Sequence, residues 1–124
     1  MPSFHPELSL PEVTLEECGD AAVVRLCGEH DLHTAPLVAR ALEPLLGGSQ
    51  PVVIDLSGTT FIDSSILHVL VRARRTAEAA GVPLGLALGE SEAARSVLEL
   101  THLPDAFVWA ASAAAAAELL AQGR

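Results

Sequence analysis

Residues 52–56, which read VVIDL, are the segment that most restricts the fold of this chain. Their apolar side chains follow one another without alternation, a pattern typical of a strand covered on both faces. A short polar loop and Phe61-Ile62 come next, and Asp63-Ser64-Ser65 then marks a helix start. Apolar residues recur after it at helical spacing until Gly81, namely Ile66, Leu70, Ala73, Ala77 and Ala80. The segment therefore predicts a buried strand, a loop and a helix with one apolar face, as in α/β proteins.

Strands and helices alternate along the rest of the chain. Further strands are predicted for Leu8–Leu15, Ala21–Cys27, Leu84–Leu88 and Phe107–Trp109, with a polar loop over Gly28–His33. Further helices are predicted from Thr34 to Gly47, from Ser91 to about Leu100, and from Ser112 onward. The first of these helices has an apolar stripe of Leu37, Val38, Ala41, Leu42 and Leu45. The order β-β-α-β-α-β-α-β-α predicts one α/β domain over residues 1–124, with a largely parallel or mixed sheet.

The composition excludes several classes of protein. Half of the 124 residues are hydrophobic, which argues against disorder. The formal net charge is −9, and all seven basic residues are arginines, so a generic basic surface for nucleic acid is not expected. Arg72, Arg74 and Arg75 lie next to Glu78, and we interpret them as a solvated helix face. With no Tyr, one Trp and three Phe, the chain also lacks a platform for stacking bases.

Nothing in the sequence predicts membrane insertion. The longest apolar stretch is shorter than the ~20 residues that span a bilayer. The first residues, MPSFHPELSL, lack the basic and apolar regions of a signal peptide, so we expect a cytoplasmic protein. Cys18 and Cys27 lack metal-ligand spacing and are too few for a disulfide framework, so we interpret them as a turn residue and a small strand residue.

The turn Asp63-Ser64-Ser65 allows three interpretations. Asp63 or Ser64 could cap the helix by accepting hydrogen bonds from its free N–H groups. The helix start could also bind an anion, or a hydroxyl could carry a phosphate. Ser64 and His68 are four residues apart and could act as a nucleophile and a base, but no G-x-S-x-G motif or oxyanion loop accompanies them. Capping explains one oxygen-bearing residue and does not require three.

Two other polar segments contain residue types that could carry chemistry. Residues 55–59, DLSGT, resemble the aspartyl-phosphate motif of haloacid-dehalogenase-like phosphatases, but Ser57 replaces its second acid and the chain has no lysine. Asp55 and Ser57 are better interpreted as a strand end and turn. Residues 28–34 hold two histidines and two acids that could bind a metal, yet a second ligand cluster is missing, so Asp31 or Thr34 as a helix cap is preferred. We expect no metal, no cofactor and no enzymatic activity, with His68 and His102 on the surface or at helix ends.

Two motifs in this order are similar to those of a known family. Residues 26–35, LCGEHDLHTA, are similar to L-x-G-E-L-D-x-x-T-A, and residues 53–65 are similar to V-x-L-D-L-x-x-x-x-F-x-D-S-S-G-L. On these residues the chain resembles the STAS family, and within it the bacterial anti-sigma factor antagonists (anti-anti-sigma factors, SpoIIAA-like). The resemblance extends from about Leu8 to Leu120. It implies a single STAS domain over residues 1–124 with a core at about 8–120, and the STAS (SpoIIAA-like) fold, a mixed sheet with flanking helices.

The resemblance also implies a regulatory mechanism. In the family, the unphosphorylated antagonist binds an anti-sigma factor that is also a serine kinase, which frees the sigma factor and so regulates transcription. The kinase phosphorylates the first serine after the aspartate, here Ser64, and the added charge of about −1.5 to −2 beside Asp63 and Asp31 ends the binding. Asp63 would also orient the Ser64 hydroxyl. The residues expected to contact the partner are Asp31, Thr34, Asp63, Ser64, Ser65 and Ile66.

Two positions depart from the family pattern. Ile66 stands where the family has glycine, which permits close approach of backbones, and His30 stands where it has leucine. The apolar stripe predicts that Ile66 points inward, whereas an outward side chain would block a kinase or select a different one. The alternative is therefore a STAS module that binds without a switch: a lipid-transport complex subunit, a stressosome-type scaffold or a nucleotide-binding domain. The partner and the oligomeric state are not specified by the sequence.

Overall fold

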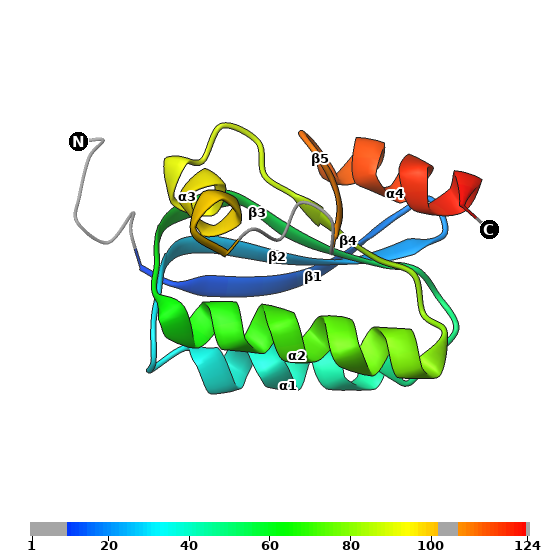
Figure 1. The fold of residues 1–124 in the computed structure, drawn as a ribbon, viewed down its shortest axis with the longest axis horizontal. Coiled ribbons are helices and arrows are strands. Elements are labelled where there is room, and N and C mark those ends of the chain that lie inside the picture. The colour runs from blue at the N-terminus through cyan, green and yellow to red at the C-terminus, as the bar shows by residue number, and fades with distance from the viewer. Residues whose placement is uncertain (1–9, 102–106, 124) are drawn as a thin grey trace.

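A computed structural model describes residues 10–101 and 107–123, which form five strands and four helices (Figure 1). The strands are β1 (Glu12–Cys18), β2 (Ala21–His30), β3 (Val52–Ile62), β4 (Leu84–Ala87) and β5 (Val108–Ala110). The helices are α1 (Ala35–Leu46), α2 (Ser64–Ala80), α3 (Glu92–Thr101) and α4 (Ala113–Gln122). The predicted element order is confirmed. Leu8, His102 and Pro104 lie outside the described residues.

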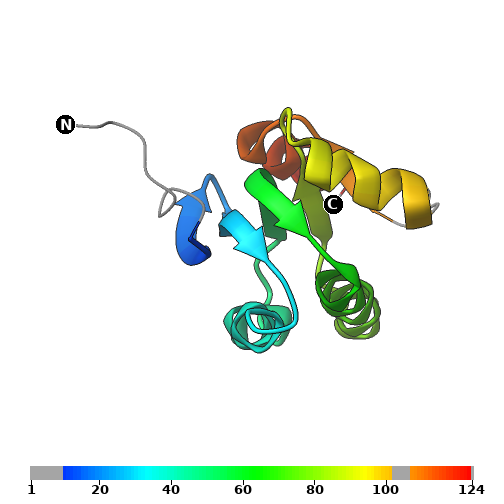
Figure 2. The same ribbon diagram turned by 90° about the vertical axis from the view of Figure 1, so that its left-hand side faces the viewer.

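The five strands form one mixed sheet in the order β1-β2-β3-β4-β5. β1 runs antiparallel to β2, and the remaining neighbours are parallel. Two helices cover each face: α1 and α2 lie below the sheet in Figure 1, and α3 and α4 lie above it, an arrangement that Figure 2 shows from the side. The predicted α/β fold with flanking helices is confirmed. Among the described residues, none of the helices has the length and hydropathy needed to cross a bilayer.

β3 runs through the core, as its apolar sequence predicts. Val52, Val53, Ile54 and Leu56 are all fully buried. The larger hydrophobic cluster joins one face of the sheet to α1 and α2, and a smaller one joins the other face to α4. In α2 the predicted stripe is buried from Ile66 to Ala77, whereas Ala80 is exposed. The burial of this stripe fixes the rotation of α2 about its axis and therefore fixes which residues of its first turn reach solvent.

Three sequence predictions are corrected by the fold. β2 and β3 are longer than expected, because their backbones keep pairing through polar residues: Gly28 pairs with Thr59, and His30 with Ile62. The predicted polar loops over residues 28–30 and 57–60 are therefore strand. In α1 the buried residues are Ala35, Val38, Leu42 and Leu46, while Leu37 is 55% exposed, because the helix turns a slightly different face to the sheet.

Candidate functional site

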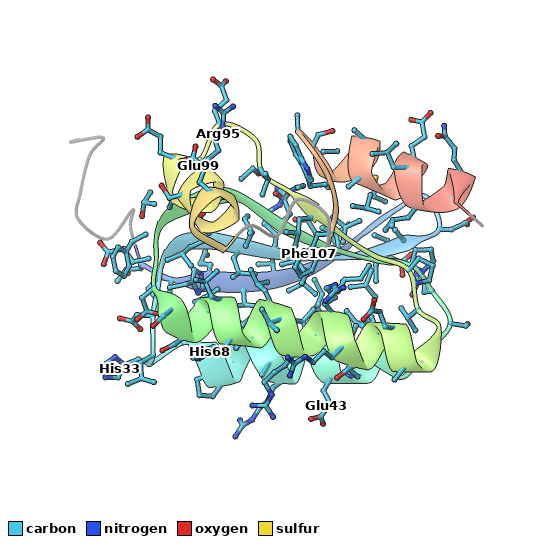
Figure 3. The ribbon with its side chains drawn as sticks, in the orientation of Figure 1. His33, Glu43, His68, Arg95, Glu99 and Phe107 are labelled. Carbon is cyan, nitrogen blue, oxygen red and sulfur yellow. The ribbon has the colours of Figure 1, made fainter. Side chains whose placement is uncertain are left out.

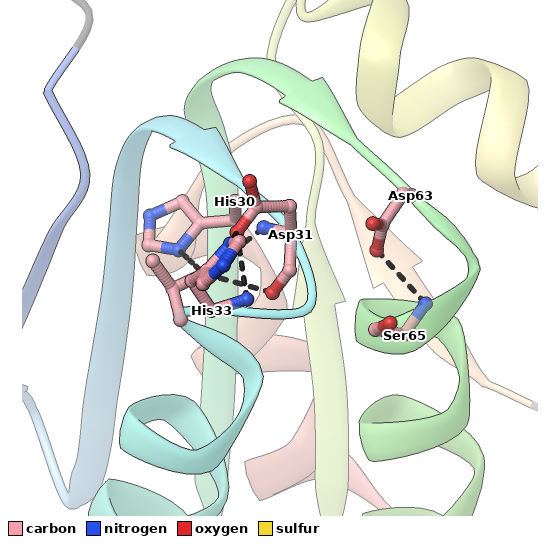
Figure 4. A network of polar contacts seen from close by, with 6 residues as sticks. His30, Asp31, His33, Asp63 and Ser65 are labelled. Atoms are coloured by element: carbon pink, nitrogen blue, oxygen red, sulfur yellow. Dashed lines mark hydrogen bonds and ion pairs between the residues drawn. The ribbon is translucent and has the colours of Figure 1, made fainter.

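The predicted site residues meet where β2 and β3 end. His30 and Ile62 form the last pair of the two parallel strands, so Asp31 and Asp63 each follow directly after that pair. The loop 31–34 then leads into α1, and Asp63 leads into α2. Figure 4 shows the two segments side by side at this edge of the sheet. Residues 32 positions apart in sequence therefore share one surface, because parallel strands end at the same edge.

Asp63 caps α2, as one of the sequence interpretations required. Its backbone is extended, with φ −110° and ψ −175°, and its Oδ1 accepts a hydrogen bond of 2.8 Å from the Ser65 N–H. This bond satisfies one of the free donors of the first helical turn. Ser64 is the first residue of the helix and is exposed. Among the described residues, none makes a hydrogen bond with the Ser64 hydroxyl, so this hydroxyl is accessible from solvent.

Ile66 points into the core, which confirms the predicted orientation. Its exposed fraction is 0%, and it packs in the cluster between the sheet and the two helices α1 and α2. The branched side chain therefore does not obstruct the surface beside Ser64. The expectation that Ile66 contacts a partner is corrected for the same reason, because a fully buried side chain cannot reach one. The half-buried Ser65 offers its side chain next to Asp63 instead.

The loop 31–34 is held by hydrogen bonds of its own. Asp31 Oδ1 accepts a bond of 2.8 Å from the His33 N–H, and this bond, together with the nearby imidazole of His33, holds the pKa of Asp31 below its ordinary value. Thr34 precedes α1 but makes no side-chain capping bond. It is only 7% exposed, and its hydroxyl accepts from the Asp31 N–H at 3.0 Å. The expectation that Thr34 contacts a partner is corrected: its burial leaves it a role inside the loop.

His30 is completely buried beneath this loop. Its Nδ1 lies 3.0 Å from Thr34 Oγ1, and its Nε2 lies 3.0 Å from the carbonyl oxygen of Cys27. Both ring nitrogens are therefore occupied by protein atoms, which removes His30 from any metal-ligand set. Among the residues that the structure describes, no group of three His, Cys, Asp or Glu side chains is arranged to hold a metal ion.

Two exposed apolar side chains lie in the two segments of the site, and the sequence interpretation missed both. Leu32 in the β2–α1 loop is 68% exposed, and Phe61 near the end of β3 is 48% exposed. Phe61, Leu67 and Glu92 line a pocket of about 400 Å³ that reaches Ser64. Exposed apolar groups within a polar rim are typical of binding surfaces. The sequence signal that could have identified them is a large apolar residue next to polar ones: Leu32 between Asp31 and His33, and Phe61 after Thr59 and Thr60.

Asp55 and His68, the residues on which the two enzyme interpretations depend, do not make the contacts that catalysis would need. Asp55 is buried, accepts bonds from the N–H (2.9 Å) and the hydroxyl (2.6 Å) of Ser57, and pairs with Arg25 at 3.3 Å. Asp55 and Ser57 lie inside β3, so the predicted strand end and turn is wrong, and the bonds of Asp55 leave it engaged rather than free to act as a nucleophile. His68 is exposed on α2, as predicted (Figure 3), and within the described part of the chain it makes no hydrogen bond with Ser64.

The arginines of α2 match the solvated face expected for them. Arg74 and Glu78 form an ion pair of 3.4 Å at i,i+4 spacing. Arg72 and Arg75 are exposed on the same helix. Such exposed pairs contribute little to stability, about 0.3–0.5 kcal/mol on a helix. The interpretation as a charged, water-facing side of α2 therefore holds.

Comparisons with known proteins support this fold over almost the whole chain. The chain is similar to the crystal structure of an anti-sigma factor antagonist from Mycobacterium paratuberculosis, with 25% identity, a TM-score of 0.81 and coverage of 91% of this chain and 96% of that one. It is also similar to the anti-sigma factor antagonist SpoIIAA in its unphosphorylated form, with 22% identity, a TM-score of 0.73 and coverage of 91% and 98%. The Bacillus SpoIIAA in its phosphorylated form gives 22% identity, a TM-score of 0.67 and coverage of 91% and 100%.

A family model identifies the domain. No curated protein sequence matches the chain. The model described as STAS domain matches residues 12–116, which include β1, both loops of the candidate site and the first part of α4. The chain therefore belongs to the STAS domain family.

Proposed function

We propose that this protein is an anti-sigma factor antagonist whose unphosphorylated form binds an anti-sigma factor with serine kinase activity and thereby releases a sigma factor. The observation that carries the proposal is the Ser64 hydroxyl, exposed and without a partner among the described residues at the first position of α2. The similarity to a mycobacterial anti-sigma factor antagonist along 91% of the chain supports it. We propose a binding protein of the cytoplasm, with no catalytic activity of its own.

The chemistry around Ser64 fits a protein partner. Leu32 in the β2–α1 loop and Phe61 near the end of β3 offer exposed apolar side chains, and the carboxylates of Asp63 and Glu92 line the same pocket as Phe61. Buried apolar anchors within a polar rim supply most of the affinity in protein interfaces. The negative rim favours a partner surface that carries basic side chains.

Phosphorylation of Ser64 would end the binding by electrostatics. A phosphoserine adds a charge of about −1.5 to −2 at neutral pH, here directly after the Asp63 carboxylate. A partner surface that approaches this turn would have to desolvate the phosphate and two neighbouring acids together, which opposes association. The start of α2 tolerates the phosphate, because the free N–H groups and the dipole of a helix favour negative charge at its N-terminus. The proposed switch therefore changes the surface and leaves the fold intact.

The test uses every anti-sigma factor kinase encoded in the same genome. Each purified kinase is incubated with ATP and the protein, phosphate is mapped by mass spectrometry, and binding is measured by calorimetry for the wild type, Ser64→Ala and Ser64→Asp. We expect one kinase to modify Ser64 alone, Ser64→Ala to bind like the wild type, and Ser64→Asp to bind at least about tenfold more weakly. Phosphate on another residue, or none with any kinase, would overturn the switch. Ser65→Ala serves as the matched control, since its neighbour should still be phosphorylated.

A STAS module that binds without a switch is the competing proposal. The sequence suggested this alternative because an outward-pointing Ile66 would block a kinase. The Ile66 side chain is fully buried, so it does not block a kinase at Ser64. Ser64→Asp separates the two proposals, because a constitutive module would bind its partner equally well with either residue.

A further inference from the structure

The proposed switch does not use His30, yet this residue is buried where the site begins. It is the last residue of β2, and its register partner is Ile62. The pairing of β2 with β3 shifts register on both sides of Cys27 and Gly28, and Gly28 adopts a φ of +85°. The strand therefore bends just before His30, and the Cys27 carbonyl lies within hydrogen-bond distance of the ring of His30.

The hydrogen bonds around the His30 ring determine which of its two nitrogens carries the proton. The carbonyl oxygen of Asp31 already accepts from the N–H groups of Thr34 (3.1 Å) and Ala35 (2.9 Å). The Thr34 hydroxyl accepts from the Asp31 N–H, and its own proton can go to that carbonyl at 3.2 Å or to His30 Nδ1 at 3.0 Å. The Cys27 carbonyl can only accept, so Nε2, which lies 3.0 Å from it, carries the proton of the neutral ring and donates to that carbonyl. Nδ1 of the neutral ring is then an acceptor, and the Thr34 hydroxyl is the donor that faces it.

We propose that His30, as the neutral Nε2–H tautomer, is a positioning residue that fixes the loop 31–34 beside Ser64. The ring ties the end of β2 to Thr34, Thr34 holds the Asp31 N–H, and the Asp31 carboxylate holds the His33 N–H (Figure 4). Leu32 lies inside this chain of bonds and has its exposed position set by it. The importance of the loop for partner binding rests on the proposed function, whereas its positioning by His30 does not.

Three substitutions separate the two bonds of the ring. His30→Leu removes both bonds, so the Thr34 hydroxyl and the Cys27 carbonyl each lose their hydrogen-bond partner on the His30 ring. His30→Asn places an acceptor near the position of Nδ1, and His30→Gln places a donor near the position of Nε2. We expect the bond to Thr34 to order the loop, so that His30→Asn restores the wild-type loop and His30→Gln restores it less. Thr34→Val removes the same bond from its other end, together with the bond that the Thr34 hydroxyl accepts from the Asp31 N–H.

The first experiment needs no partner. Nitrogen NMR of the wild type with labelled histidine should show His30 protonated at Nε2 and unprotonated at Nδ1. Hydrogen exchange of the Asp31 and His33 amides should quicken at least about tenfold in His30→Leu and in Thr34→Val, relative to the Leu70 amide in the core of α2. The double variant should exchange more slowly than the product of the two single effects predicts, because both substitutions remove the same bond between the His30 ring and the Thr34 hydroxyl. A ring protonated at Nδ1, or loop amides unchanged in Thr34→Val, would overturn the proposal even if His30→Leu failed to fold.

The second experiment connects the loop to the partner. With the kinase that modifies Ser64, we expect His30→Leu to raise KM for the protein substrate at least about fivefold and to leave kcat unchanged, with KM restored in His30→Asn. A loop that exchanges faster while KM stays at the wild-type value would overturn the role in partner binding. If no kinase modifies the wild type, the proposed function fails, and the NMR and exchange measurements alone decide for or against the positioning of the loop.

Discussion

Asp63 is the residue in which structure and proposed function meet most directly, because one carboxylate caps α2 and also lies beside Ser64. Its Oδ1 accepts the Ser65 N–H at 2.8 Å. We predict that Asp63→Ala lowers the free energy of unfolding by about 1 kcal/mol, and that Asp63→Asn lowers it by much less, because an asparagine oxygen can accept the same bond. Urea unfolding of the three proteins measures both differences.

A second N-cap provides the control for Asp63. Ser112 caps α4 by accepting a bond of 3.1 Å from the Ala115 N–H. This helix contributes no residue to the candidate site. Ser112→Ala should destabilise the protein to a similar degree and leave phosphorylation of Ser64 at the wild-type rate. Asp63→Ala should slow phosphorylation if the Asp63 carboxylate orients the Ser64 hydroxyl. Equal slowing in Asp63→Ala and Ser112→Ala would show that lost stability alone is the cause.

Asp31 should make stability depend on pH in the acid range. The His33 N–H lowers the pKa of Asp31 in the folded protein, so the stabilisation is complete above the ordinary pKa of about 3.9 and is lost as the pH falls through the folded value. We predict that the wild type loses stability relative to Asp31→Asn as the pH falls from about 5 to about 2. Denaturant unfolding at several pH values measures the difference, and a constant difference across that range would contradict the prediction.

The sequence specified some residues of the site better than others. The capping role of Asp63 could be predicted because capping depends only on the few residues around a helix start. The burial of Thr34 and the exposure of Leu32 could not, because both depend on how the loop folds over His30. The pairing of a histidine ring with a threonine four residues later involves a bend in β2 that no local pattern announces.

At the scale of elements, the close contact of β2 and β3 at Gly58 is the most demanding feature. A Cβ added to Gly58 would lie 2.7 Å from the Cys27 sulfur, a separation that real Cβ atoms do not show. We predict that Gly58→Ala destabilises the protein by about 1–3 kcal/mol, as overpacking usually does. Cys27→Ala removes the sulfur, so the double variant should be more stable than the sum of the two single effects implies.

Unfolding free energies of the four proteins in this cycle measure the coupling. Gly47→Ala is a suitable control, because a Cβ there would have no neighbour closer than 3.8 Å. Strictly additive effects of Gly58→Ala and Cys27→Ala would show that the sulfur is not the cause of the strain. The cycle also tests the register of the two strands directly, since Cys27 and Gly58 are partners only after the register shift.

The elements that were predicted well are those whose pattern is decided by burial. α2 buries Ile66, Leu70, Ala73 and Ala77 as predicted, because these residues recur at helical spacing and form one continuous apolar stripe. The apolar residues of α1 cover a wider arc of the helix surface, so the sequence does not determine which of them face the sheet. In the structure Ala35 is buried and Leu37 is exposed. β2 and β3 were predicted too short, because backbone pairing with a neighbouring strand can continue through polar side chains.

At the scale of the whole molecule, the excess of negative charge destabilises the folded state by repulsion. The chain carries 16 acidic and 7 basic residues, and the ion pairs that use its arginines include Arg25 with Glu16 and Asp55, and Arg74 with Glu78. Most carboxylates therefore repel one another across the surface, a repulsion that the unfolded chain relieves by expanding. Phosphorylation of Ser64 would add to this excess at the edge of the sheet where Asp31 and Asp63 already lie.

We predict that added NaCl raises the Tm of the wild type at neutral pH, because salt screens repulsion between exposed charges more than about 10 Å apart. The effect should nearly vanish close to the isoelectric point, where the net charge is small, and this separates screening from a general effect of salt on apolar burial. Thermal unfolding followed by circular dichroism at low and high NaCl, at both pH values, makes the comparison. A Tm that falls with NaCl at neutral pH would mean that the ion pairs of Arg25 and Arg74 outweigh the net repulsion. In that case Arg25→Gln should reverse the sign of the salt effect.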